Sequence, residues 1–242
     1  MTPSALVDFV NADGNILVAA TSTTPLSSSL AGLLAELDIT LPVERTNTVV
    51  DHFNYDSTSS PEEHNVLVLD TPASVRAGLK NYFEIPGSVL AVPHVSGHVL
   101  GNSHLLTPVL RAPSTAYSYK PKEQSDVIEA DELFAAGRQL GLVSVAQARN
   151  SARVSLIGSA EMLQDKWFDA KVSKAGGEKA VVENREFARR ISGWTFQEIG
   201  VVRVNEVEHR LTGDKETNPG IYRIKTDVVS TQWRMKLFYS SD

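Results

Sequence analysis

Short apolar runs alternate with helical patterns along most of the chain. Apolar runs bounded by turn signals are typical of strands that are buried on both faces of a parallel sheet. They predict strands at residues 16–20, 66–70, 89–92, 142–146 and 154–158. Apolar positions three or four apart predict helices at residues 5–10, 30–37, 129–141, 160–172 and 183–199. This alternation predicts an α/β fold with an open, mostly parallel sheet flanked by helices.

Two regions depart from this simple pattern. Residues 94–113 contain glycines and prolines and are expected to form short strands and loops. After Val204 the pattern changes, because residues 209–222 resemble a loop and residues 221–239 alternate like β-structure. We therefore expect an α/β domain at residues 1–205 and the start of a β-sandwich-like domain at residues 206–242. Two strands alone are marginal in water, so we expect this second domain to be incomplete in this chain. We also expect the first sheet to lack its N-terminal strands.

Composition excludes several classes of function. With 42% hydrophobic and 21% charged residues, the chain is globular rather than disordered. Its formal charge of −6 argues against nucleic-acid binding, which needs a concentrated basic face. The densest basic run, residues 185–190, is interleaved with acids and is expected to be a solvated helix face. The chain has no cysteine, so disulfides, thiolate metal sites and cysteine nucleophiles are excluded.

The most polar stretch between two apolar segments is Thr48 to Asp56, with the sequence TVVDHFNYD. Asp51, His52 and Asp56 could form an acid–base group, because a neighbouring carboxylate can orient an imidazole. The alternative is a loop in which the Asp and Asn side chains satisfy backbone groups while an aromatic residue packs. We favour the loop, because adjacent residues of an extended segment point to opposite faces.

Other candidate chemistry is weaker. His94, His98 and His104 could suggest a metal site, but the glycines and prolines around them argue against a regular helix, and no acid lies among them. We therefore predict no metal site and no cofactor. Asp70 follows an apolar strand and could contact a ligand or cap the next helix. The sequence contains no G-x-S-x-G, G-x-x-x-x-G-K-[ST] or G-x-G-x-x-G motif.

Several motifs occur in an order and spacing that together resemble one family. They are Gly14–Ala20 (GNILVAA), Val49–Asp56 (VVDHFNYD), Ser114–Tyr119 (STAYSY), Leu142–Ala146 followed by Gln147–Val154 (QARNSARV), Gly158–Ser159, and Trp194–Val204 (WTFQEIGVVRV). This series resembles the DDOST/Wbp-type subunits of the oligosaccharyltransferase of the endoplasmic reticulum. The resemblance runs along nearly the whole chain.

The resemblance implies a lumenal GIFT-like domain, of Rossmann or flavodoxin type, followed by β-rich domains and one C-terminal membrane helix that is absent from this chain. It implies a non-catalytic structural subunit in the endoplasmic reticulum membrane, with the catalytic and accessory subunits as its partners. That complex transfers a preassembled oligosaccharide from dolichyl diphosphate to Asn in N-x-S/T sequons.

No catalytic residue follows from the resemblance, and no cofactor. Asp51, His52, Asn54, Tyr55 and Asp70 are expected to shape the fold or a subunit contact. Two alternatives stay open: an α/β hydrolase-type enzyme that uses Asp51 and His52, and a soluble scaffold of the intraflagellar-transport type.

Overall fold

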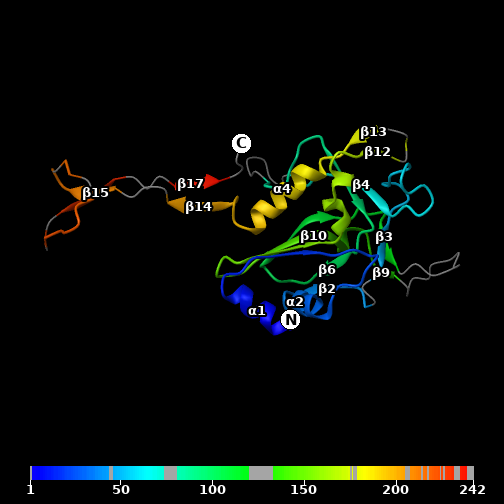
Figure 1. The fold of residues 1–242 in the computed structure, drawn as a ribbon, viewed down its shortest axis with the longest axis horizontal. Helices are drawn as coiled ribbons and strands as arrows, with labels where there is room; N and C mark the ends of the chain where they lie inside the picture. Colours follow the sequence, from blue (N-terminus) through cyan, green and yellow to red (C-terminus); the bar gives the residue numbers. More distant parts are fainter. Residues whose placement is uncertain are drawn as a thin grey trace. The chain divides into compact units, whose positions relative to one another are not determined.

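The computed structural model describes residues 2–43, 46–73, 81–119, 133–174, 176, 179–204, 208–213, 215–216, 218–223, 225, 227–231 and 235–238 (Figure 1). These residues form two units, Met1–Phe196 and Gln197–Asp242. The first unit contains the helices and most of the strands. It is the unit that positions the candidate site.

A six-stranded sheet lies at the centre of the first unit. Its order is β1 (Ile16–Ala19), β11 (Arg153–Ile157), β10 (Leu140–Gln147), β6 (His98–Leu100) and β2 (Ile39–Thr40), and β7 (Leu106–Arg111) also pairs with β10. Strands β1 and β11 are parallel, while β10 is antiparallel to each of its three partners and β2 is antiparallel to β6. Seven of the eight residues of β10 are buried.

Helices cover both faces of this sheet (Figure 1). On one face, α1 (Pro3–Asn11) and α2 (Ser28–Glu36) pack apolar side chains such as Val10 and Leu34 against β1, β10 and β11. On the other face, α4 (Asn184–Thr195) lies against β11, where Ser155 and Thr195 share a hydrogen bond of 2.5 Å between their hydroxyls. Successive residues of β11 therefore face different helices, as the period of two in a strand requires.

In the described part of the first unit, three smaller antiparallel sheets accompany the central one. They are β4 (Val66–Asp70) with β5 (Val89–Pro93), β3 (Thr48–Val50) with β8 (Tyr117–Tyr119) and β9 (Leu133–Ala136), and β12 (Lys171–Ser173) with β13 (Lys179–Val181). The prediction of a mixed α/β fold is confirmed. The expected mostly parallel order is not: among the strand pairs described, β1–β11 is the parallel one. A strand is buried on both faces when helices cover both sides of its sheet, whether its neighbouring strands are parallel or antiparallel. An apolar run therefore does not tell the two arrangements apart.

One predicted helix is wrong and another is only partly formed. In the range 129–141, residues 129–132 lie outside the described residues, residues 133–136 are strand β9, and Gly137–Gln139 form a short 3₁₀ turn, η2. Gly137 has a φ of +59° and donates its amide to the Ala116 carbonyl at 2.7 Å, which turns the chain from β9 into β10. Pairing with β8 therefore overrides the helical spacing.

The range 160–172 contains a 3₁₀ turn, η3 (Ala160–Leu163), and a single helical turn, α3 (Asp165–Phe168), before β12 begins. Gln164 has extended backbone angles and separates the two turns. The predicted helix at 183–199 is confirmed as α4, although α4 begins at Asn184 and ends at Thr195. The inner face of α4 is buried, with Phe187 and Ile191 fully enclosed.

The described part of the second unit consists of two antiparallel pairs. They are β14 (Val201–Val204) with β17 (Met235–Phe238) and β15 (Glu208–Leu211) with β16 (Val228–Thr231). The boundary expected at residues 205/206 stays a prediction.

Candidate functional site

Asp51 organises the loop that follows β3. Its side chain is fully buried and accepts four hydrogen bonds. Oδ1 accepts the amides of Phe53 at 2.8 Å and Asn54 at 3.2 Å, while Oδ2 accepts the Asn54 side-chain amide at 2.9 Å and the Thr115 hydroxyl at 2.8 Å. This arrangement holds the turn closed. It is the backbone-satisfying role that the sequence favoured.

Asp56 anchors a second segment to the same loop. Its carboxylate is buried and accepts the Ser59 amide at 3.1 Å and the Ser59 hydroxyl at 2.5 Å through Oδ2. Its Oδ1 accepts the backbone amide of Ser173, at the end of β12, at 2.7 Å. Ser57 donates its amide to the Ser173 carbonyl at 2.8 Å, so Ser173 both donates and accepts a hydrogen bond at this contact. The loop and the β12–β13 hairpin are therefore tied together.

His52 lies on the exposed side of this loop and contacts His64 and Tyr117. The two Nδ1 atoms of His52 and His64 are 2.5 Å apart, and His52 Nε2 is 2.8 Å from the Tyr117 hydroxyl. The Tyr55 ring stacks on His64 with centroids 3.9 Å apart. Burial and the neighbouring Tyr119 raise the pKa of Tyr117. We call His52, Tyr55, His64 and Tyr117 the histidine–tyrosine cluster.

Phe53 projects from the loop beside the histidine–tyrosine cluster. Its side chain is 69% exposed, although Asp51 holds its backbone amide in place. Aromatic residues are enriched at protein interfaces, while single exposed apolar residues are also common on protein surfaces.

The geometry does not join Asp51 and His52 into an acid–base pair. Both Asp51 oxygens are occupied by other donors, and His52 is oriented by His64 and Tyr117. The side chain of Asn54 completes the turn instead of facing outward as a ligand. Of the five predicted site residues, Asp51, His52, Asn54 and Tyr55 come together in one loop.

Asp70 lies apart from that loop, at the end of β4. Its side chain is 86% exposed and is 3.7 Å from the Lys174 ammonium. It borders an open groove of about 450 Å³, whose lining includes Thr71, Glu84, Ser88 and Lys174. Because Lys174 follows Ser173, the β12–β13 hairpin links this groove to the Asp56 turn. An exposed ion pair of this kind contributes little to stability.

Sequence reasoning missed His64 and Tyr117. His64 precedes β4 by two residues and was not assigned to any motif, whereas Tyr117 was part of the STAYSY motif. The antiparallel pairing of Val50 with Tyr117 brings β8 beside the loop. That pairing joins residues far apart in the sequence, so local pattern gives no signal of it.

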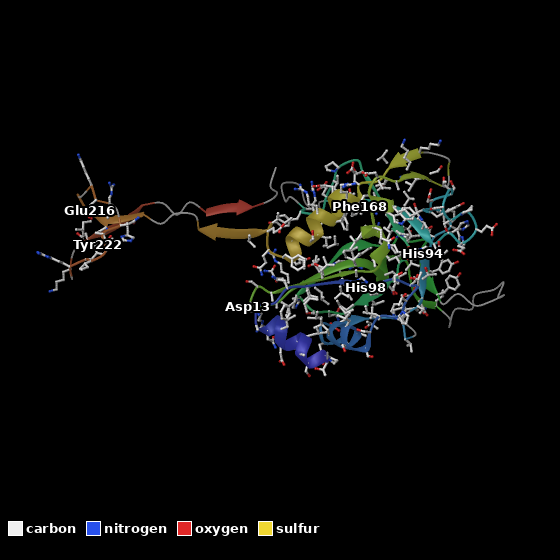
Figure 2. All side chains as sticks on the ribbon, in the orientation of Figure 1. Asp13, His94, His98, Phe168, Glu216 and Tyr222 are labelled. Atoms are coloured by element: carbon white, nitrogen blue, oxygen red, sulfur yellow. The ribbon has the colours of Figure 1, made fainter. Side chains whose placement is uncertain are left out.

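The structure does not bring His94, His98 and His104 together as a metal centre. His94 Nδ1 is 2.5 Å from Glu161 Oε2, His104 is exposed, and His98 is enclosed with its Nε2 2.6 Å from the Ser144 hydroxyl (Figure 2). Burial lowers the pKa of His98 to about 3, so it is neutral at physiological pH. No group of three or more His, Cys, Asp or Glu suited to a metal ion occurs in the part of the chain that the structure describes.

The basic run at residues 185–190 is paired with acids, as expected. Glu186 accepts hydrogen bonds from Arg189 at 2.9 Å and Arg190 at 2.7 Å, and the hydrogen bond from Arg189 is the main cause that lowers the pKa of Glu186. Arg185 bonds Asp169 at 2.7 Å. This helix face therefore has compensated charge rather than a free basic patch.

The QARNSAR motif serves to hold the helices in place. Asn150 donates its side-chain amide to the Val10 carbonyl of α1 at 2.8 Å. The buried Arg153 donates to the Trp194 carbonyl of α4 at 2.6 Å, and its guanidinium lies 4.5 Å from the centre of the Trp194 ring. One short motif thus connects β11 to helices on both faces of the sheet.

Fold and site together define a mixed α/β domain with a closed acidic turn, an exposed aromatic residue and a histidine–tyrosine cluster. Residues 1–198 match the family model described as "OST48, N-terminal domain". The chain belongs to this family.

The chain is similar to curated members of the family from distant organisms. It is 35% identical over 240 residues to a protein of Caenorhabditis elegans named dolichyl-diphosphooligosaccharide–protein glycosyltransferase 48 kDa subunit, covering 96% of the chain and 51% of that protein. It is 31% identical to the subunit wbp1 of Schizosaccharomyces pombe, covering 94% of the chain and 49% of that protein. The chain therefore spans about half the length of these relatives.

A solved structure shows a similar fold. The mmIFT52 N-terminal domain aligns with a TM-score of 0.51 over 80% of this chain and 70% of that chain, at 15% sequence identity. At this identity the likeness concerns the fold alone. In the described residues, no helix has the length and apolar character needed to cross a bilayer.

Proposed function

We propose that the chain forms the lumenal part of a non-catalytic subunit of oligosaccharyltransferase in the endoplasmic reticulum membrane. The observation that carries this proposal is membership in a family whose members are named as subunits of that complex. In this role the chain supports transfer of an oligosaccharide from dolichyl diphosphate to Asn of N-x-S/T sequons, while another polypeptide performs the chemistry. Membrane attachment through a C-terminal helix, as the family resemblance implies, is part of the same proposal.

The loop from Asp51 to Asp56 is the surface that we assign to subunit contact. The Asp51 carboxylate accepts hydrogen bonds that hold the turn, and the Asp56 carboxylate accepts one that holds the β12–β13 hairpin. Neither carboxylate is therefore suited to general acid or base catalysis. The same bonds hold the backbone of Phe53, whose side chain is 69% exposed. Preorganised aromatic anchors of this kind carry much of the binding energy at interfaces.

The proposal is tested by affinity purification of the full-length gene product from detergent-solubilised microsomes. We expect stoichiometric recovery of the catalytic oligosaccharyltransferase subunit. Recovery of the protein alone, or with soluble partners only, would contradict a role as a subunit of the complex.

A second comparison tests the assigned surface. Phe53→Ala is expected to reduce recovery of at least one other subunit, because it removes an exposed side chain without disturbing the core. Phe9→Ala, at a 52% exposed position on α1, is the matched control and should leave recovery unchanged. Equal recovery in both variants would place the contact elsewhere on the subunit.

A further inference from the structure

The histidine–tyrosine cluster contains two imidazoles whose Nδ1 atoms point at one another from a fixed frame. His52 is held by the turn that Asp51 closes, and His64 is held by stacking on Tyr55 and by its own backbone, since its carbonyl accepts the Asp51 amide at 3.3 Å. The two rings are nearly perpendicular, at 82°, with centroids 4.8 Å apart. His52 is exposed and His64 is half-buried.

The outer nitrogens of the pair have oxygen partners. His64 Nε2 is 3.1 Å from the Pro61 carbonyl, which can only accept, so His64 carries its hydrogen on Nε2. His52 Nε2 is 2.8 Å from the Tyr117 hydroxyl, which can accept a hydrogen as well as donate one. Because His64 carries its hydrogen on Nε2, His52 Nδ1 donates to His64 Nδ1 at 2.5 Å when no metal ion is bound. A metal ion would replace this hydrogen: His52 would then carry its hydrogen on Nε2, facing the Tyr117 hydroxyl, and both Nδ1 lone pairs would be free for the ion. Histidines that ligate a metal ion have this arrangement, with the other ring nitrogen donating to an oxygen.

The surrounding charge favours a cation. The segment from Asp51 to His64 contains four carboxylates, Asp51, Asp56, Glu62 and Glu63, and neither lysine nor arginine. Two imidazole nitrogens bound to zinc at 2.0–2.1 Å with tetrahedral geometry lie about 3.3 Å apart. The observed 2.5 Å must therefore open by about 0.8 Å, which small rotations of two surface rings can supply.

We propose that His52 and His64 form a surface site for a divalent transition-metal ion of the type that imidazole prefers, such as zinc. The two Nδ1 atoms are the protein ligands, and water fills the remaining positions. The Pro61 carbonyl holds His64 in the binding tautomer, and the Tyr117 hydroxyl accepts the Nε2 hydrogen of His52 once the ion is bound. The site does not depend on the proposed subunit role, and it needs no group of three protein ligands.

The test is a calorimetric titration of the metal-free full chain with zinc chloride. We expect one saturable site per chain, and binding weaker by about tenfold or more in His52→Gln and in His64→Gln. His104→Gln, at an exposed histidine outside the cluster, and His94→Gln, at the imidazole paired with Glu161, are the controls and should bind as the parent does. Tyr117→Phe should keep the stoichiometry but weaken binding about tenfold, because it removes a partner of the outer nitrogen.

Circular dichroism of each variant separates loss of binding from loss of fold. His52 is exposed, so His52→Gln decides the question even if His64→Gln fails to fold. Absence of saturable binding in the parent chain, or unchanged affinity in His52→Gln, would overturn the proposal. Loss of binding in His94→Gln with retention in His52→Gln would do the same.

Discussion

At the scale of single residues, Asp51 is the residue on which the loop depends, and its role is structural. Asp51→Ala leaves the Thr115 hydroxyl and the Asn54 side chain without their acceptor. We expect the free energy of unfolding to fall by about 2 kcal/mol, since hydrogen bonds to a buried charged group are worth roughly that much. Urea denaturation measures the change.

Asp70→Asn is the matched control for that substitution. The Asp70 side chain is 86% exposed and its contact with Lys174 is 3.7 Å long, so stability should change by less than about 0.5 kcal/mol. If Asp51→Ala were as mild as Asp70→Asn, Asp51 would not be the residue that holds the loop.

His98 makes the stability of the fold depend on pH. Its pKa is about 3 in the folded chain because it is buried, against about 6.5 when exposed to water. As pH falls below 6.5, the unfolded chain takes up this proton first, so stability is full above that pH and is lost progressively toward pH 3. Between pH 7 and pH 5 the loss is about 2 kcal/mol from this residue alone.

His98→Gln tests this dependence, because glutamine can keep a bond to the Ser144 hydroxyl but does not titrate. Unfolding free energies of the parent and the variant are compared at pH 7 and pH 5. The parent should lose about 2 kcal/mol more than the variant over this interval. Parallel pH profiles would show that His98 does not contribute.

At the scale of elements, the β12–β13 hairpin is stabilised by burial of Val172 and by a hydrogen bond to Asp56, in addition to its own short pairing. The hairpin has three residue pairs, and the Ser173 amide of β12 donates a hydrogen bond to the Asp56 carboxylate. A two-stranded ribbon of this length is marginal alone. Asp56→Ala should therefore increase hydrogen exchange at Ser173 before the central sheet opens. Exchange that rises equally in β10 would show global rather than local destabilisation.

The sequence predicted elements whose own residues decide their conformation. Helix α4 was found because Phe187, Ile191 and Trp194 repeat at helical spacing and are all buried. The loop role of Asp51 was favoured because adjacent residues such as Asp51 and His52 point to opposite faces of an extended segment, and Asp side chains commonly satisfy backbone groups in turns. Strand β9 was missed because pairing with β8 decides its conformation. The contact between His52 and His64 was missed because it depends on chain closure around the loop.

At the scale of the whole molecule, the two units differ in how they are stabilised. The unit Met1–Phe196 encloses a sheet between helices, whereas the described part of Gln197–Asp242 consists of two separate strand pairs. Strand pairs of this kind open more readily than a covered sheet. The two units divide between residues 196 and 197, and the expected boundary at residues 205/206 stays a prediction.

Limited trypsin digestion tests this boundary. Brief digestion should cut first at basic residues of the second unit, after Arg203, Arg210 or Lys215, and leave a resistant fragment that begins at the N-terminus. Arg189 and Arg190 should resist cleavage for longer, because they lie within α4, whose Phe187 and Ile191 are fully buried against the first unit's core. Intact-mass measurement identifies the ends of the fragment. Early cleavage within α4 would show that the helix opens as easily as the strand pairs, and would contradict an independent first unit.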